Sequence, residues 1–381
     1  MAMQSPPTRE PREPFNVSQL RTVQVLGGGS AGSSAHVRSL AAGLVARGVH
    51  VTVCAPAELD HAHDYSGTGA GFAPVPRRGD PVSVAALRTA CLTADVVHAH
   101  GAHAAVRAAL ALGGTRIPLV VTWHARAHVE GARGRLVRLM ERRAARAAVV
   151  VLGTTSDLVD RARRRGARDA RLAPVSAPVP RLPAAAHAGK ARAEIGAVER
   201  PLILACGSLV PHHGYGTLLD AARLWRELDP APLLVIVGEG RERSALQRRI
   251  RNEALPVRLL GDRDDRAELL AAADLTVLCS SWEARSVQAQ EALRLGVPLV
   301  ATAVGGVPEL VGDAAELVPY GNAEALARAV ARLLGDRPRR EEMTAAGLAQ
   351  AASWPTEDDT IAQVLSVYDE LTQPMAAARV R

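Results

Sequence analysis

The sequence is poor in aromatic side chains and almost free of lysine. Only 3% of its 381 residues are aromatic, and Lys190 is the single lysine, so arginine supplies nearly all the positive charge behind a net charge of +7. Proteins that bind single-stranded nucleic acid stack the bases on aromatic rings, and this chain has few to offer. The composition therefore argues against nucleic acid as a partner, although a basic surface can still attract an anionic membrane.

The chain also lacks a long apolar run and any pattern of paired cysteines. No apolar stretch reaches the roughly 18 residues that a membrane-spanning helix needs. Residues 1–20 are polar and proline-rich, unlike a signal peptide, and we expect a disordered tail there. The four cysteines lie in or beside apolar segments without Cys-x-x-Cys spacing: Cys54, Cys91, Cys206 and Cys279. Reduced, buried thiols of this kind are typical of a cytoplasmic protein.

Length and segment composition predict two domains. A chain of 381 residues with 48% hydrophobic side chains can build two cores. We expect a first domain over residues 21–180, a proline- and alanine-rich linker over 181–199 and a second domain over 200–353. Short apolar strands alternate with helices in both halves, which indicates the α/β class with parallel sheets.

One strand–helix–strand unit in the second half carries two acids. An apolar strand ends in a polar loop with Glu283, a helix with Glu291 follows, and the strand 299–302 then runs into Gly305 and Gly306. In parallel α/β sheets, ligands bind at the edge where the strands end. Carboxylates at that edge can accept hydrogen bonds from sugar hydroxyls.

A glycine-rich turn follows the first strand of the first half. Residues 27–32 contain the pattern Gly-x-Gly-x-x-Gly between the strand 22–26 and a helix, as in dinucleotide-binding proteins. Those proteins place an acid at the end of the next strand to hold a ribose. Here the strand 49–54 ends in Ala55 and Pro56, so the sequence excludes NAD as a cofactor.

Histidines gather at the ends of two strands of the first half. The strand 95–101 carries His98 and His100, and His103 follows. Successive strand positions face opposite sides, so neighbouring histidines do not automatically converge, and no carboxylate or cysteine completes a ligand set; we therefore expect no metal site here. His124 ends another buried strand, where a lone histidine is either a core residue or a contact to a ligand.

The pattern of residues 126–148 predicts a strongly basic helix. Four arginines recur on one face at a spacing of three to four residues: Arg135, Arg138, Arg142 and Arg146. Such a helix either lies on anionic lipid or presents a solvated face, and both interpretations remain open. After the next strand, residues 153–156 form a strand-to-helix turn that is compatible with phosphate.

The acids of the second half and their surroundings carry a resemblance. Glu283 and Glu291 lie eight residues apart, preceded by Ser-Ser-Trp and followed by Gly-Val-Pro-Leu-Val-Ala-Thr and Gly-Gly-Val-Pro-Glu-Leu-Val. This pattern resembles the Glu-x7-Glu signature of the retaining glycosyltransferases of family 4. The resemblance extends over residues 21–372 and implies the GT-B fold. In that fold, two Rossmann-like parallel-sheet domains face each other across a cleft, and a C-terminal helix, here 356–372, crosses back to the first domain.

The resemblance also implies a reaction. Family members transfer a sugar from a nucleoside-diphosphate sugar, here a UDP- or GDP-sugar, to an acceptor hydroxyl with retention of configuration and usually without a metal or other cofactor. The acceptor expected here is a lipid-linked or small glycoconjugate. The protein would then work in the cytoplasm, with the basic helix 126–148 as a contact to the inner face of the membrane.

The same resemblance implies the site residues. Glu283 contacts the donor sugar or the reacting centre, Glu291 binds the ribose, and His124 reaches the sugar from the first domain. Two pairs of glycines complete the expected site: Gly29 and Gly32 beneath the sugar, and Gly305 and Gly306 close to the ligand.

The chain departs from the family where the diphosphate binds. Ser208 stands where the family has an arginine, and His213 stands where it has a lysine. A protonated His213 and Arg285, which lies in the Glu283 loop, are the expected substitutes, and Ser208 stays a candidate diphosphate contact. The alternative is a catalytically weakened GT-B protein that binds a nucleotide sugar or a protein partner.

Overall fold

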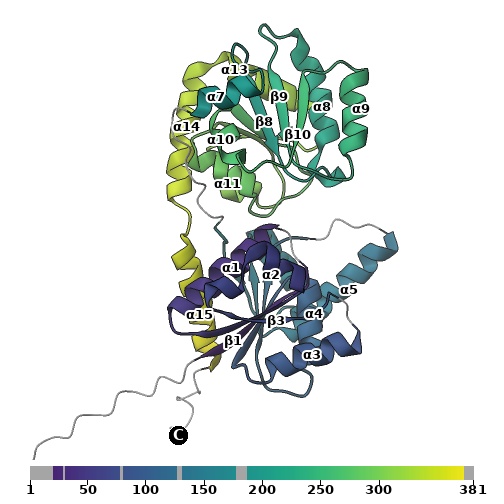
Figure 1. Cartoon of the computed structure of the whole chain (residues 1–381), viewed down its shortest axis with the longest axis vertical. Coiled ribbons are helices and arrows are strands. Elements are labelled where there is room, and N and C mark those ends of the chain that lie inside the picture. The colour runs from purple at the N-terminus through teal and green to yellow at the C-terminus, as the bar shows by residue number, and fades with distance from the viewer. Residues whose placement is uncertain (1–19, 29–30, 78–79, 127–130, 177–186, 373–381) are drawn as a thin grey trace, which may run out of the picture.

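The computed structural model describes residues 20–28, 31–77, 80–126, 131–176 and 187–372. The predicted tail and Gly29 therefore lie outside the described residues, apart from Leu20. Figure 1 shows two α/β domains one above the other, joined along one side by the C-terminal helices.

The first domain is built on a parallel sheet of seven strands in the order β3-β2-β1-β4-β5-β6-β7. The strands are short and buried because helices cover both faces of the sheet, as parallel sheets require. Their bounds are β1 (Arg21–Leu26), β2 (His50–Ala55), β3 (Gly71–Pro74), β4 (Val96–His100), β5 (Leu119–Trp123), β6 (Val150–Gly153) and β7 (Ala170–Leu172).

Helices of the first domain divide between the two faces. One core joins the sheet to the first and the last helix of the chain, and the other joins it to the four helices α3 to α6. The helical segments are α1 (Ala31–Ala46), α2 (Ala57–His63), η1 (Ser66–Thr68), α3 (Pro81–Cys91), α4 (Ala102–Ala111), α5 (Gly131–Ala147) and α6 (Ser156–Arg165). In Figure 1, α5 projects from the side of this domain.

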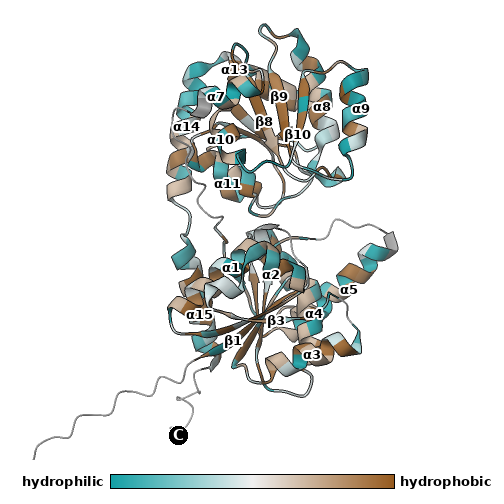
Figure 2. Ribbon diagram, in the orientation of Figure 1, coloured by the Kyte–Doolittle hydropathy of each residue, from teal (hydrophilic) through white to brown (hydrophobic). Residues whose placement is uncertain are grey.

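The second domain repeats the plan with six parallel strands in the order β10-β9-β8-β11-β12-β13. Their bounds are β8 (Leu202–Cys206), β9 (Leu233–Val237), β10 (Val257–Gly261), β11 (Leu275–Leu278), β12 (Leu299–Thr302) and β13 (Glu316–Val318). Its helical segments are α7 (His187–Glu194), η2 (Pro211–His213), α8 (Tyr215–Leu224), η3 (Trp225–Glu227), α9 (Arg243–Asn252), α10 (Arg266–Ala271), α11 (Val287–Arg294), α12 (Val307–Val311), α13 (Ala323–Gly335) and α14 (Arg337–Ala352). Figure 2 shows the hydrophobic strands at the centre of each domain.

Helix α7 lies within the stretch expected as a linker. It packs against α10 and buries Ala191, while Ile195 after it is 3% exposed. These apolar side chains make residues 187–195 part of the second domain's core.

The last helix, α15 (Glu357–Thr372), returns to the first domain and packs on α1. A Cβ added at Gly43 of α1 would lie 2.1 Å from Cδ1 of Ile361, so the absence of a side chain there lets the two helices approach. Arg47 and Arg171 of the first domain pair with acids of α15. This arrangement confirms the predicted α/β class, the two Rossmann-like domains and the crossing helix. Among the described helices, none is both long and apolar enough to cross a membrane.

Candidate active site

The Glu283 loop follows β11 at the edge of the second sheet where the strands end. Ser280 donates a hydrogen bond to Oε1 of Glu283 at 2.7 Å, and Thr302 of β12 donates to the Ser280 backbone carbonyl at 2.7 Å. Burial raises the pKa of the Glu283 carboxyl, and the Ser280 hydrogen bond partly opposes that shift. The adjacent strands thus hold this carboxylate in one orientation.

The loop after β8 brings His213 next to Glu283. His213 Nε2 lies 3.9 Å from Oε1 of Glu283, and the His213 ring hydrogen-bonds to the backbone of Ser208. Burial lowers the pKa of His213, so the ring is neutral at pH 7. The structure therefore brings Ser208, His213 and Glu283 together, as the pattern of the sequence implied, but the lysine position carries no charge.

One further positively charged residue near the loop after β8, Arg241, was not predicted from the sequence. Burial and then His213 lower the pKa of His212, and Arg241, in the exposed turn after β9, adds a smaller effect in the same direction. The Gly-Glu-Gly turn at residues 238–240, which directly precedes Arg241, was the signal in the sequence that could have pointed to this arginine.

Glu291 lies on α11, the helix capped by Ser286, whose hydroxyl accepts from the Ala289 N–H. Its carboxylate is buried and accepts a hydrogen bond at Oε1 from Nη2 of Arg266 on α10, at 2.7 Å. Sequence reasoning missed Arg266 because α10 and α11 meet only in the fold. The ion pair fixes Oε1 of Glu291 to Arg266 of α10.

The two glycines of the turn after β12 are required by protein contacts. Gly305 has a φ of +54°, and a Cβ there would lie 2.1 Å from the Glu283 carbonyl oxygen. A Cβ at Gly306 would lie 2.3 Å from Cγ2 of Thr155 in the first domain. These glycines therefore allow the turn to pack against the Glu283 loop on one side and the first domain on the other.

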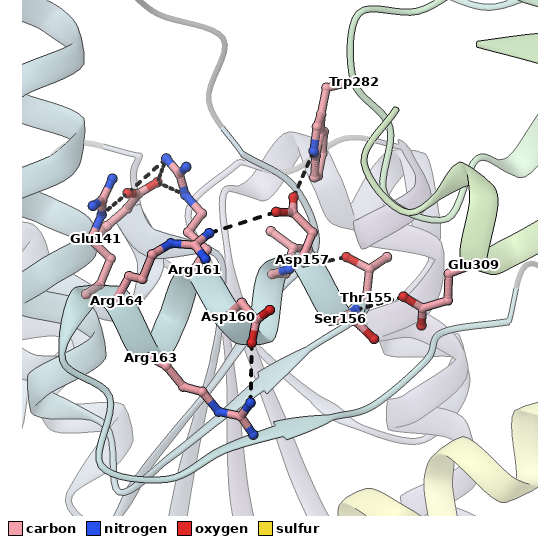
Figure 3. A network of polar contacts seen from close by, with 12 residues as sticks. Glu141, Thr155, Ser156, Asp157, Asp160, Arg161, Arg163, Arg164, Trp282 and Glu309 are labelled. Carbon is pink, nitrogen blue, oxygen red and sulfur yellow. Dashed lines mark hydrogen bonds and ion pairs between the residues drawn. The ribbon is translucent and has the colours of Figure 1, made fainter. Parts of the chain in front are cut away.

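The start of α6 is one place where the domains touch (Figure 3). Trp282 Nε1 donates to Oδ2 of Asp157 at 3.0 Å, and the Ser156 N–H donates to Oε2 of Glu309 at 2.9 Å. A carboxylate is favoured at a helix N-terminus because exposed N–H groups and the helix dipole meet it there. The turn predicted to suit phosphate thus receives the carboxylate of Glu309 from the second domain.

Arg285 also lies at the junction of the domains. Its Nε donates to the Val175 carbonyl at 2.8 Å, and its guanidinium lies 5.8 Å from the ring centre of Trp354. Burial lowers its pKa. These contacts hold the guanidinium at the domain junction. From the sequence, we had instead expected it to contact the diphosphate.

His124 lies after β5 in a cluster of histidines. Ring nitrogens of His36, His100 and His124 lie within 4.8 Å of one another, close enough to hold a metal ion. His98 and His100 stack with centroids 4.4 Å apart. His98 and His100 lie two positions apart on β4 and therefore share a face of the sheet, where His100 meets His36 and His124. His103 lies elsewhere, beside Gly27.

Burial keeps the histidines of this cluster uncharged. Burial lowers the pKa of His98 to about 3 and that of His36 to about 4, and it places the pKa of His100 and His124 well below the usual value. All four rings are therefore neutral at pH 7.

The glycine-rich turn of the first domain borders a hollow. Gly28 has a φ of +97° and packs against Arg77, while Gly32 lies exposed in the first turn of α1. A hollow of about 380 Å³ adjoins it, lined by Pro56, Ala57, Glu58, Pro74, Val75, Pro76 and Arg77. This space lies where β2 and β3 end.

Helix α5 presents the expected arginines to solvent together with apolar residues. Arg135, Arg138, Arg142 and Arg146 are all exposed. Leu136 and Leu139 between them are 57% and 53% exposed. Buried Glu141 attaches the other side of α5 to α6 through hydrogen bonds from Arg161 and Arg165.

Comparison with known proteins agrees with this geometry. Two family models match, "Glycosyl transferase 4-like domain" over residues 31–178 and "Glycosyl transferases group 1" over residues 189–350. The chain is 33% identical over 178 residues to a GDP-mannose-dependent monoacylated alpha-(1-6)-phosphatidylinositol monomannoside mannosyltransferase of Corynebacterium glutamicum, covering 44% of this chain and 47% of that protein. It is 35% identical over 188 residues to a D-inositol 3-phosphate glycosyltransferase of Thermomonospora curvata, covering 44% and 42%.

The matched regions are partial, while the fold match is nearly complete. The chain matches less than half the length of these two curated relatives. The solved structure of HepE from Anabaena in complex with UDP superposes with a TM-score of 0.79 at 19% identity, covering 92% of this chain and 100% of that chain.

Proposed function

The chain belongs to the GT-B glycosyltransferases of family 4, and we propose that it transfers a sugar from a UDP- or GDP-sugar to an acceptor hydroxyl. The observation that carries the proposal is the pair Glu283 and Glu291 on one strand–helix–strand unit, with Glu283 held by Ser280 and Glu291 by Arg266. The named relatives add two precedents: one uses GDP-mannose, and another binds UDP. Retention of configuration and independence from metal follow from the resemblance and belong to the proposal.

Each carboxylate has a separate role. Oε2 of Glu291 accepts a hydrogen bond from a ribose hydroxyl, since Arg266 already donates a hydrogen bond to Oε1. Glu283 meets the donor sugar or the reacting centre, and His124 contacts the sugar from the first domain. Gly305 and Gly306 let the turn approach the same space, and Gly32 lies at the start of α1 on the first-domain side.

The leaving diphosphate needs positive charge, because breaking its bond to the sugar leaves an anion. Arg285 is held at the domain junction, so we assign this task to His213 and Arg241, with Ser208 as a hydrogen-bond donor. A charge-assisted hydrogen bond contributes about 1.5–3 kcal/mol. A neutral His213 therefore weakens catalysis until a bound diphosphate draws a proton onto the ring.

That neutrality favours a second candidate function. With His213 uncharged and the family arginine replaced by Ser208, the site can bind a nucleotide sugar and turn it over slowly. A binding protein with weakened catalysis would keep Glu291 and lose most of its rate.

On the acceptor side, we assign the hollow of about 380 Å³ near Arg77 to the acceptor glycoconjugate. Helix α5, with exposed arginines around Leu136 and Leu139, suits a peripheral contact with anionic lipid on the cytoplasmic face of a membrane. A lipid-linked acceptor would reach the hollow from that surface.

The test is a thermal-shift panel of UDP, GDP, ADP and TDP with their common sugars, followed by turnover with the responding donor. A ligand at 100 times its dissociation constant stabilises by about 2.7 kcal/mol, which raises the midpoint visibly. We expect one base to respond, and Glu291→Gln to abolish that response. A response without turnover supports the binding protein, and no response to any nucleotide contradicts both functions.

A further inference from the structure

An unbroken run of hydrogen bonds crosses the core of the first domain and ends at His124. It joins three strands, the last helix and the loop after β5, and every member except His124 is at most 8% exposed. We call it the buried chain, and its members in order are Thr122, His98, Tyr368, Gln24, His100 and His124.

The distances show that each link is a true hydrogen bond. The first two links, on either side of the His98 ring, are 2.6 Å each. Gln24 Nε2 donates to the Tyr368 hydroxyl at 3.0 Å, and Gln24 Oε1 lies 3.0 Å from Nε2 of His100. His100 Nδ1 lies 3.1 Å from Nε2 of His124.

The number of protons in the buried chain is fixed. His98 and His100 are 0% and 8% exposed, and no carboxylate is among the hydrogen-bond partners of their ring nitrogens, so each ring carries one proton. A neutral imidazole has one donor nitrogen and one acceptor nitrogen. Along the links from Gln24 through His100 to His124, the donor at one link therefore determines the donor at the next.

Gln24 sets that choice. Its amide nitrogen donates to the Tyr368 hydroxyl, and Nδ1 of His98 lies 2.6 Å from the same hydroxyl. At the other end, its carbonyl oxygen accepts only from a protonated Nε2 of His100. His100 Nδ1 then carries a lone pair and must accept from Nε2–H of His124.

We propose that Gln24 and Tyr368 are positioning residues that hold His124 in the tautomer with its proton on Nε2. The inference rests on the proposed function in one respect, the contact of His124 with the donor sugar. Nε2 is committed to His100, so only Nδ1, which has a lone pair and no proton, is left for substrate. His124 therefore accepts a hydrogen bond from a sugar hydroxyl. The crossing helix takes part in this control through Tyr368, 244 positions after His124 in the chain.

The experiment is a long-range ¹H–¹⁵N correlation spectrum of the full chain labelled on histidine nitrogens, with the His124 ring assigned by its loss in His124→Asn. In the wild type we expect the His124 proton on Nε2. Tyr368→Phe removes the link that orients the Gln24 amide, and it should give a mixture of His124 tautomers. Tyr65→Phe, at a fully buried tyrosine of the same domain outside the buried chain, is the matched control.

A second pair of variants distinguishes a change of the His124 tautomer from a general folding defect. Gln24→Glu keeps an oxygen facing Nε2 of His100 and should preserve the His124 tautomer, whereas Gln24→Leu should not. A His124 proton on Nδ1 in the wild type would overturn the proposal. So would stoichiometric uptake of Zn²⁺ that removes the Nε2 proton of His124, because the cluster would then be a metal site.

Binding measurements separate this inference from the proposed function. Tyr368→Phe should weaken binding of the nucleotide sugar about three- to tenfold and leave the affinity for the free nucleoside diphosphate unchanged. If the spectra show the expected tautomers but binding of the nucleotide sugar does not change, the order of the buried chain stands and the sugar contact assigned to His124 is wrong.

Discussion

Replacing His213 by lysine tests the assignment of the leaving-group site most directly. The ring of His213 lies 3.9 Å from Glu283 and is neutral at pH 7 because burial lowers its pKa. Lysine is long enough to reach the same space, and its ordinary pKa of about 10.4 leaves a wide margin for a charged side chain at pH 7. His213→Lys therefore adds a permanent charge where the family carries one.

The size of the effect follows from the environment. A charge-assisted hydrogen bond contributes about 1.5–3 kcal/mol, and each 1.36 kcal/mol of barrier is tenfold in rate, which gives a gain of about 10- to 100-fold in kcat. The His213 side chain is 23% exposed, so water screens the added charge. The variant also loses the hydrogen bond to Ser208. We therefore expect about tenfold.

The assay is kcat against pH with the donor found by thermal shift. In the wild type, His213 gains its proton as pH falls through its lowered pKa, so kcat should rise toward acid pH. Activity should fall again once Glu283 is protonated, which happens at a higher pH than for an ordinary glutamate because its pKa is raised. His213→Lys should remove the alkaline decline and leave the acid decline in place.

The refuting result is an unchanged alkaline decline with no gain in kcat, which would remove His213 from the diphosphate. The matched control is His50→Lys, which adds the same charge at the start of β2, at the opposite edge of the first sheet. An equal gain in both variants would point to net charge instead of a local contact.

Three further predictions concern stability and membranes. Gly305→Ala should destabilise more than Gly321→Ala in urea: both have positive φ (+54° and +75°), which alone costs about 1–2 kcal/mol, but only the first Cβ meets a carbonyl oxygen, at 2.1 Å. Stability should fall as pH drops below about 6.5, by up to about 1.4 kcal/mol per pH unit for a histidine such as His98, because the unfolded chain binds the proton and the folded ring, with a pKa of about 3, does not. Leu136→Glu combined with Leu139→Glu should abolish cosedimentation with anionic vesicles and leave turnover of a water-soluble acceptor unchanged.

Each of these has a result that would contradict it. Equal losses at the two glycines would mean that the turn after β12 relaxes around an added methyl group. A urea midpoint that stays flat between pH 6.5 and 4 would mean that the buried rings take up protons without unfolding. Equal binding of wild type to neutral and anionic vesicles would exclude the arginines of α5 as the membrane contact.

Much of the fold follows from local patterns in the sequence. Short apolar runs bounded by glycine and proline located the buried strands, because a parallel strand covered on both faces needs apolar residues throughout. The ends of the linker were harder to predict, because the side chains of Ala191 and Ile195 pack on partners that are distant in the sequence. Glu283 and Glu291 were found because they lie on one contiguous unit.

The directions of long side chains could not be found in this way. Arg285 has several torsions, and its choice of the Val175 carbonyl and the Trp354 ring depends on how the domains meet. The contact of Trp282 with Asp157 joins residues 125 positions apart and has no local signal.

The sequence alone determined the class of fold, the two sheets and the unit that carries both acids, because spacing and hydrophobicity act within a few residues. Only the tertiary structure decided which histidines converge, which charge meets the start of α6, and which side chains the buried chain links. Those outcomes depend on side chains from β1, β4, β5 and α15 sharing one dry interior, where every donor must find an acceptor.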